Sequence, residues 1–230
     1  NTNTLVFPPY LVPVEYLDGS GVTGEIVPVM STQLQAESTY IIKCVFSLKT
    51  SDMKTTNYVF DFYPAHDSGS TSHIKVFVER STSNIRFVVT YSNWNYWVNA
   101  NSLQWDTDKI TVTLDANQKK FLASDEHGNS VAGTVTSALS TDKYGLCSFM
   151  GQTLSNEYPL YGKFYYCYIQ NGDNIAGLWI PCRRNDGNVN FYIADCVRGS
   201  VAINYTGVFD APGQVFGPDI NLDEVQQYFE

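Results

Sequence analysis

Residues 163–184 read KFYYCYIQNGDNIAGLWIPCRR, two runs of aromatic and aliphatic residues separated by Asn171-Gly172-Asp173. Runs rich in aromatic and β-branched residues are typical of strands. Glycine and asparagine tolerate the positive φ angles that a tight hairpin turn requires. The stretch therefore predicts two antiparallel strands, over residues 163–170 and 178–180, joined by a hairpin.

The same pattern recurs along most of the chain. Ile110, Val112 and Leu114 alternate with Thr111 and Thr113, which is the period of a half-buried strand. Further strand-like runs cover residues 42–48, 58–63, 74–78, 85–91 and 190–193. Clusters of turn-forming residues lie between them at 66–70, 126–129 and 185–187. We therefore expect about ten to fourteen short strands joined by turns.

The periodicity also limits the fold class. No segment shows helical spacing of apolar residues for more than two turns, so parallel βαβ architecture is excluded. The one candidate helix is terminal, with Asn221 as its cap and Glu224 returning the hydrogen bond. The sequence predicts an all-β fold, an antiparallel two-sheet β-sandwich of the jelly-roll type.

The chain length of 230 residues suits one such core. We find no internal repeat and no linker. The predicted organisation is an N-terminal arm over residues 1–13, one jelly-roll domain over residues 14–218, and a C-terminal arm or short helix over residues 219–230.

The charge balance disfavours two classes of partner. The chain has 14 Lys and Arg against 23 Asp and Glu, a formal net charge of −9, which disfavours nucleic-acid binding and docking on anionic lipid. No apolar stretch approaches the roughly 20 residues that a membrane helix needs, so we expect no membrane insertion. The N-terminus lacks the features of a signal peptide, although a sequence that starts after processing would look the same.

The cysteines predict no structural zinc site. The five are Cys44, Cys147, Cys167, Cys182 and Cys196, and no two are spaced as a Cys-x-x-Cys pair. We expect all five to be reduced, and the alternative is one bridge between Cys182 and Cys196.

Residues 162–217 carry a family resemblance, which extends more loosely over most of residues 14–218. An aromatic-rich strand (164–169), a turn (171–173), an apolar strand ending in proline and basic residues (178–184), an Asp-Gly hairpin (186–187) and a closing Gly-rich stretch (205–217) follow one another in order. This order resembles the concanavalin A-like, laminin-G-like jelly-roll domains of tail, fibre and other surface proteins of bacteriophages and prophages. The sequence departs from the family pattern at residues 190–193, so no role is carried over from the aspartate usual there.

The resemblance implies a non-catalytic structural or decoration protein of a phage virion, made in the host cytoplasm. It also implies adhesion to glycans of the bacterial surface, contacts with other virion proteins and a homo-oligomer. Three alternatives stay open: a purely architectural virion protein, a secreted bacterial lectin-like adhesin, and a glycanase.

Enzymatic motifs are absent. No glutamate begins the Glu-x-Asp-x-x-Glu strand of related endo-β-glucanases, whose mechanism needs two carboxyl groups about 5 Å apart. His66, His73 and His127 fall in or beside turn segments and are expected to be solvated. No nucleophile elbow or phosphate-binding loop occurs.

We expect no cofactor, with calcium as the one alternative. The resemblance to laminin-G-like domains implies a rim site, for which Asp67, Asp106, Asp108 and Asp125-Glu126 would supply oxygens. Aspartates in turns are equally what turn chemistry predicts without a metal.

The candidate binding residues are Asn93, Trp94, Asn95, Tyr96 and Trp97, followed by Trp105. In an extended segment, Trp94 and Tyr96 point one way while Asn93, Asn95 and Trp97 point the other. Aromatic rings and amides together suit a sugar, which offers a C–H face and hydroxyls. These aromatics could equally fill the core, as we expect of Tyr63, Tyr165 and Trp179. Arg183 and Arg184 are read either as a grip for an acidic sugar or as a local salt bridge with Asp186.

Overall fold

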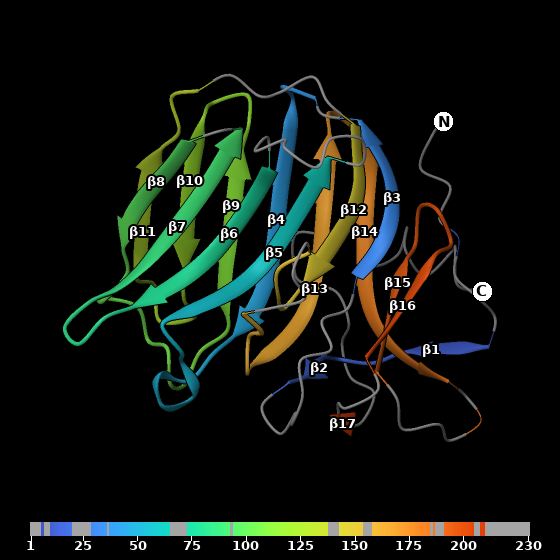
Figure 1. The fold of residues 1–230 in the computed structure, drawn as a ribbon, viewed down its shortest axis with the longest axis horizontal. Helices are drawn as coiled ribbons and strands as arrows, with labels where there is room; N and C mark the ends of the chain where they lie inside the picture. Colours follow the sequence, from blue (N-terminus) through green and yellow to red (C-terminus); the bar gives the residue numbers. More distant parts are fainter. Residues whose placement is uncertain are drawn as a thin grey trace.

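The computed structural model describes residues 6, 10–19, 29–35, 37–64, 73–92, 94–137, 143–153, 158–184, 186, 191–204 and 208–209. These residues form two stacked antiparallel sheets, seen face-on in Figure 1 with the six-stranded sheet in front. The strand order of the six-stranded sheet is β3 (Val29–Gln35), β12 (Lys143–Phe149), β5 (Thr56–Pro64), β6 (His73–Arg80), β7 (Ile85–Ser92), β8 (Trp94–Asn99).

The larger sheet contains the hairpin of residues 163–184. Its order is β11 (Ser130–Thr134), β10 (Lys120–Ser124), β9 (Ile110–Asp115), β4 (Tyr40–Ser47), β13 (Lys163–Asn171), β14 (Asn174–Arg184), β15 (Phe191–Asp195), β16 (Val201–Asn204). Three short strands join its margin: β1 (Leu11–Pro13), β2 (Leu17–Asp18) and β17 (Val208–Phe209). The predicted antiparallel two-sheet sandwich of jelly-roll type is confirmed.

The core lies between the sheets because alternate residues of each strand face inward. In β9, Ile110, Val112 and Leu114 are buried while the residues between them are partly exposed, as the alternation predicted. The centre of the core is aromatic: the Trp179 ring lies 5.4 Å from that of Phe62 and 5.3 Å from that of Phe149. Burial of such rings is the main stabilising contribution to a fold of this kind.

A second apolar cluster covers the outer face of the larger sheet. Leu11 and Tyr16, from the N-terminal segment, are buried in it together with Tyr165 and Tyr168 of β13. Residues 11–13, expected to be part of an arm, pair with β14 as an added strand. The N-terminal segment therefore packs against the outer face of the larger sheet.

The six-stranded sheet has a different outer face. At one end of this face, Thr153 and Tyr158 lie over β5. Towards β8 the face carries exposed side chains, among them Trp97. At the β8 edge the two sheets also meet, because the Tyr96 hydroxyl on β8 is 3.1 Å from the Thr136 hydroxyl just after β11.

Other expectations have mixed outcomes. The described part of the chain contains a single turn of 3-10 helix, Thr50–Asp52, and the expected terminal helix and arm at 219–230 lie outside the described residues. Among described helices, none has the length and apolar character to cross a bilayer. The five cysteines are all buried and carry free thiols.

Candidate functional site

The register of β8 against β7 decides which side chains reach the outer surface. Trp97 lies opposite Val88, and Asn95 lies opposite Thr90. Since directly opposite residues share a face, and Val88 and Thr90 alternate with the core residues Phe87, Val89 and Tyr91, these side chains point outward. Trp97 is 56% exposed.

An ion pair beside Trp97 restricts its ring. The Arg86 guanidinium lies 5.7 Å from the centre of the Trp97 ring. The same guanidinium donates hydrogen bonds from Nε (2.7 Å) and Nη2 (2.5 Å) to Oε1 of Glu79. These cation–π and charge-assisted contacts hold all three side chains in one arrangement.

Next to this arrangement lies an open pocket of about 330 Å³. The residues that line it are Glu79, Ser81, Asn84, Arg86, Trp97 and Asn99. They come from β6, β7, β8 and the turn between β6 and β7, so three neighbouring strands build the site. Its volume is at the small end of the range for ligand pockets.

The amide side chains of the pocket are fixed by Asn101. The Asn101 backbone N–H donates to Oδ1 of Asn99 (3.1 Å), and its Nδ2 donates to Oδ1 of Asn84 (3.3 Å). Within the described part of the chain, the Nδ2 groups of Asn84 and Asn99 have no acceptor, and Oε2 of Glu79 accepts no hydrogen bond. Donors and an acceptor are thus left for a ligand beside an exposed indole.

The other candidate residues of this segment have separate places. Trp94 lies opposite Tyr91, on the side of the strand away from Trp97, and it is 65% exposed. Tyr96 is on the same side as Trp94, and its hydroxyl accepts a hydrogen bond from the Ser137 N–H at 2.9 Å. Asn95 accepts one from Thr90 at 2.6 Å. Asn93 lies outside the described residues.

Trp105 does not belong to this surface, which corrects the candidate set. Its side chain is 3% exposed, and its ring lies 5.5 Å from that of Phe87 and 6.2 Å from that of Phe46. Its indole N–H donates to the Ala100 carbonyl at 2.9 Å. Trp105 is a core residue because the loop after β8 turns inward, and it is not available to a surface ligand.

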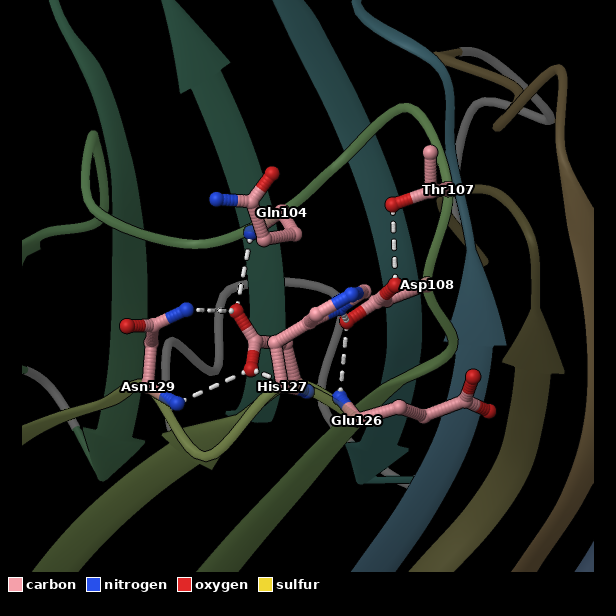
Figure 2. A network of polar contacts seen from close by, with 7 residues as sticks. Gln104, Thr107, Asp108, Glu126, His127 and Asn129 are labelled. Carbon is pink, nitrogen blue, oxygen red and sulfur yellow. Dashed lines mark hydrogen bonds and ion pairs between the residues drawn. The ribbon is translucent and has the colours of Figure 1, made fainter.

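Figure 2 shows what the candidate calcium ligands do. Asp108 accepts hydrogen bonds from the Glu126 N–H (2.9 Å) and the Thr107 hydroxyl (2.9 Å), and Nδ1 of His127 lies 2.6 Å from its Oδ2. Burial acts to raise the pKa of Asp108, but these hydrogen bonds hold it below its usual value. The hydrogen bond and the charge of Asp108 in turn raise the pKa of His127.

Asp125 is engaged in the same way. It accepts hydrogen bonds from the Gln104, His127 and Asn129 backbone N–H groups and from the Asn129 amide, all at 2.8 to 2.9 Å. The carboxylate is therefore used to shape the turn between β10 and β11.

The remaining acids do not complete a metal site. Asp106 binds the N–H (2.7 Å) and hydroxyl (2.8 Å) of Thr50, and the Glu126 carboxylate points away from Asp108 in Figure 2. Over the residues that the structure covers, no three Asp, Glu, His or Cys side chains gather closely enough to hold a metal ion. The described residues of this group do not fit calcium, and Asp67 lies outside them.

One buried pair of polar residues was not predicted from the sequence. His73, expected in solvated surroundings, is 5% exposed, and its Nδ1 lies 2.7 Å from Oδ1 of Asp61, which is fully buried. Oδ2 of Asp61 accepts from the Thr153 N–H at 3.1 Å. The pair holds Thr153 against the outer face of the six-stranded sheet.

Of the two arginines after Pro181, Arg184 forms the local salt bridge with Asp186 that was one of the two predictions. Nη2 of Arg184 lies 2.8 Å from the Asp186 carboxylate, and both side chains are nearly half exposed. Such a surface ion pair contributes little to stability.

No protein-family model matches the chain, and no curated protein matches its sequence. Similar solved structures include a native heptameric SAP-like pentraxin from Limulus polyphemus, at 8% identity over 71% of this chain and 77% of that chain, with a TM-score of 0.49. Domains LG4-5 of the mouse laminin alpha1 chain are 14% identical over 90% of this chain and 48% of that chain, with a TM-score of 0.46. The Ruminococcus gnavus IT-sialidase CBM40 bound to alpha2,3 sialyllactose is 8% identical over 70% and 89%, with a TM-score of 0.42. At these values the likenesses identify no ligand and no site residue of this chain.

Proposed function

We propose that this protein is a non-catalytic carbohydrate-binding domain whose site surrounds Trp97 on the outer face of the six-stranded sheet. The observation that carries the proposal is the pocket beside an exposed indole. In it, the Nδ2 groups of two asparagines and one carboxylate oxygen have no hydrogen-bond partner among the described residues. A pyranose ring presents a C–H face and hydroxyl edges, which an indole ring and these polar groups are suited to contact.

The arrangement supports binding because it exists before a ligand arrives. Arg86 and Glu79 fix one side of the Trp97 ring, and Asn101 fixes the amides of Asn84 and Asn99. A site whose side chains are already ordered loses less conformational entropy on binding.

The acids of the site support binding without catalysis. Glycoside hydrolysis by the usual mechanisms needs two carboxyl groups flanking the scissile bond. Glu79 is the one acid among the six residues that line the pocket, and its Oε1 is occupied by Arg86. We therefore propose that a bound glycan is held and not cleaved.

The proposed setting is a phage particle, where this domain would attach to glycans of the bacterial surface as one of several virion proteins and as a homo-oligomer. The support is the family resemblance alone, which is clearest over residues 162–217. Mass spectrometry of purified phage particles tests whether the protein is part of the virion. Light scattering of the isolated protein tests whether it forms a homo-oligomer. Absence from particles would contradict the setting without affecting the glycan site.

The binding experiment is a screen of bacterial polysaccharides on an array, followed by titration calorimetry of the strongest binder. We expect Trp97→Ala to weaken binding about fivefold or more, because a ring stacked on an aromatic side chain contributes about 1–3 kcal/mol. Trp94→Ala is the matched control, since Trp94 is equally exposed on the opposite side of β8. Equal losses in both variants, or no binding by the native chain, would refute the proposed site.

A further inference from the structure

A row of side chains continues from Trp97 across the outer face of the sheet. Tyr58 of β5 lies opposite Phe77 of β6, Phe77 opposite Val88 of β7, and Val88 opposite Trp97 of β8. Neighbouring strands lie about 4.8 Å apart, so the row from Tyr58 to Trp97 spans roughly 14 Å. This distance is longer than one sugar ring.

The far end of the row carries a second exposed ring. Tyr158 stacks on Tyr58 with ring centres 5.8 Å apart, and the Tyr58 N–H donates to the Tyr158 carbonyl at 3.2 Å. Tyr158 is 45% exposed and has a φ of 53°, a left-handed conformation that is unfavourable for a residue other than glycine. Strain of this kind is concentrated at binding sites, where surrounding contacts maintain it.

A cation lies beside this row. The Lys75 ammonium is 5.6 Å from the centre of the Tyr58 ring, and burial lowers the pKa of Lys75. Asp61 is opposite Lys75 in register, but its carboxylate is taken by His73 and Thr153. Lys75 has no ion pair within the described part of the chain. A partly desolvated cation is stabilised by an anionic group brought by a ligand.

We propose that the ligand of this surface is an acidic oligosaccharide that crosses the strands from Trp97 to Tyr158 and places a carboxylate beside Lys75. This inference rests on the proposed function, to which it adds a direction, a minimum length and a charge. A neutral sugar bound at Trp97 alone would make no contact with Lys75 or Tyr158.

The experiment uses the whole chain and the bacterial polysaccharides of the binding screen. The acidic polysaccharide that binds most tightly is compared with the same polymer after its carboxylates have been reduced to alcohols, and with its fragments of increasing length. The variants are Lys75→Gln, Lys75→Arg and Tyr158→Ala, with Lys120→Gln on β10 of the larger sheet as the matched control.

We expect carboxyl reduction to weaken binding by the native chain about tenfold or more, because a hydrogen bond to a charged group contributes about 1.5–3 kcal/mol. Lys75→Gln should show the same loss and bind both polymers equally, while Lys75→Arg and Lys120→Gln keep the preference. Tyr158→Ala should weaken binding of long fragments only.

Three results would overturn the inference and leave the proposed function standing: exclusive binding of neutral polysaccharides, equal binding of both forms by the native chain, or full affinity of the shortest fragment. Failure of every polysaccharide to bind would instead remove the proposed function itself.

Discussion

Trp94 and Trp97 lie three residues apart on one strand and face opposite sides of it, because Trp94 is in register with the core residue Tyr91 and Trp97 with the outward-facing Val88. The two indoles are the most exposed large apolar side chains among the described residues. Their opposite directions mean that one sugar ring cannot stack on both. Comparing the glycan affinities of Trp97→Ala and Trp94→Ala therefore separates binding at the outer face of the six-stranded sheet from a general effect of losing an exposed apolar side chain.

Tyr96 is expected to ionise early. Burial acts to raise its pKa, but hydrogen bonds from Ser137 and Thr136 lower the pKa of Tyr96 to about 8. The unfolded chain has a tyrosine pKa of about 10. The native state is then favoured progressively as pH rises from 8 to 10, and this contribution is absent below pH 8.

Phenolate absorbance against pH measures this directly. We expect one tyrosine equivalent to titrate near pH 8 in the native protein and to disappear in Tyr96→Phe. Denaturant unfolding should show the gap in stability between the two proteins widening from pH 8 to pH 10. A first tyrosine step near pH 10 in both proteins would contradict the hydrogen-bonded phenol.

Trp105 should behave as a core residue. Replacing Trp105 with alanine leaves a cavity beside Phe46 and Phe87, which costs about 3–5 kcal/mol in the free energy of unfolding. Trp94→Ala, an exposed change, should stay within about 0.5 kcal/mol. Urea denaturation of both variants makes the comparison, and a small loss for Trp105→Ala would mean that the ring is not packed as described.

The His127–Asp108 pair predicts a pH dependence with a defined sign. The pKa of His127 is raised in the folded state, so its contribution is complete below the unfolded value of about 6.5 and is lost as pH rises through the folded pKa. We expect the melting temperature to fall over that interval by more in the native chain than in His127→Asn. Nuclear magnetic resonance titration of the imidazole in Asp108→Asn should give a lower pKa than in the native chain, and an unchanged value would reject the pair.

Asp61 should be important for the position of Thr153. Asp61→Ala removes the acceptor of both His73 and the Thr153 N–H, and each buried group left unpaired costs about 1–3 kcal/mol. Asp186→Ala, which breaks the exposed ion pair with Arg184, is the control and should cost less than about 1 kcal/mol. Similar losses for the two variants in thermal unfolding would show that the buried pair is not a structural anchor.

The strands and their faces could be predicted because alternation is a local property. Residues 110–114 and the hairpin at 171–173 show the pattern in the sequence and adopt it in the structure. The same rule gave the opposite directions of Trp94 and Trp97, since successive side chains of a strand alternate.

The rest of the site could not be predicted because it depends on pairing between strands. Glu79 and Arg86 meet Trp97 only once β6, β7 and β8 are in register, and no spacing in the sequence encodes that register. Trp105 was misplaced because proximity in sequence does not show that the loop after β8 turns inward. His73 was misplaced because its neighbours in sequence are turn-forming residues, while its partner Asp61 lies on the adjacent strand.

The most direct test of the glycan site follows the four tryptophan indole N–H signals in a two-dimensional nuclear magnetic resonance spectrum while the screened polysaccharide is added. Single substitutions assign each signal. We expect the Trp97 signal to shift with saturation while those of Trp94 and the buried Trp105 and Trp179 stay in place. A shift of the Trp94 signal with Trp97 unchanged would contradict a binding surface on the outer face of the six-stranded sheet.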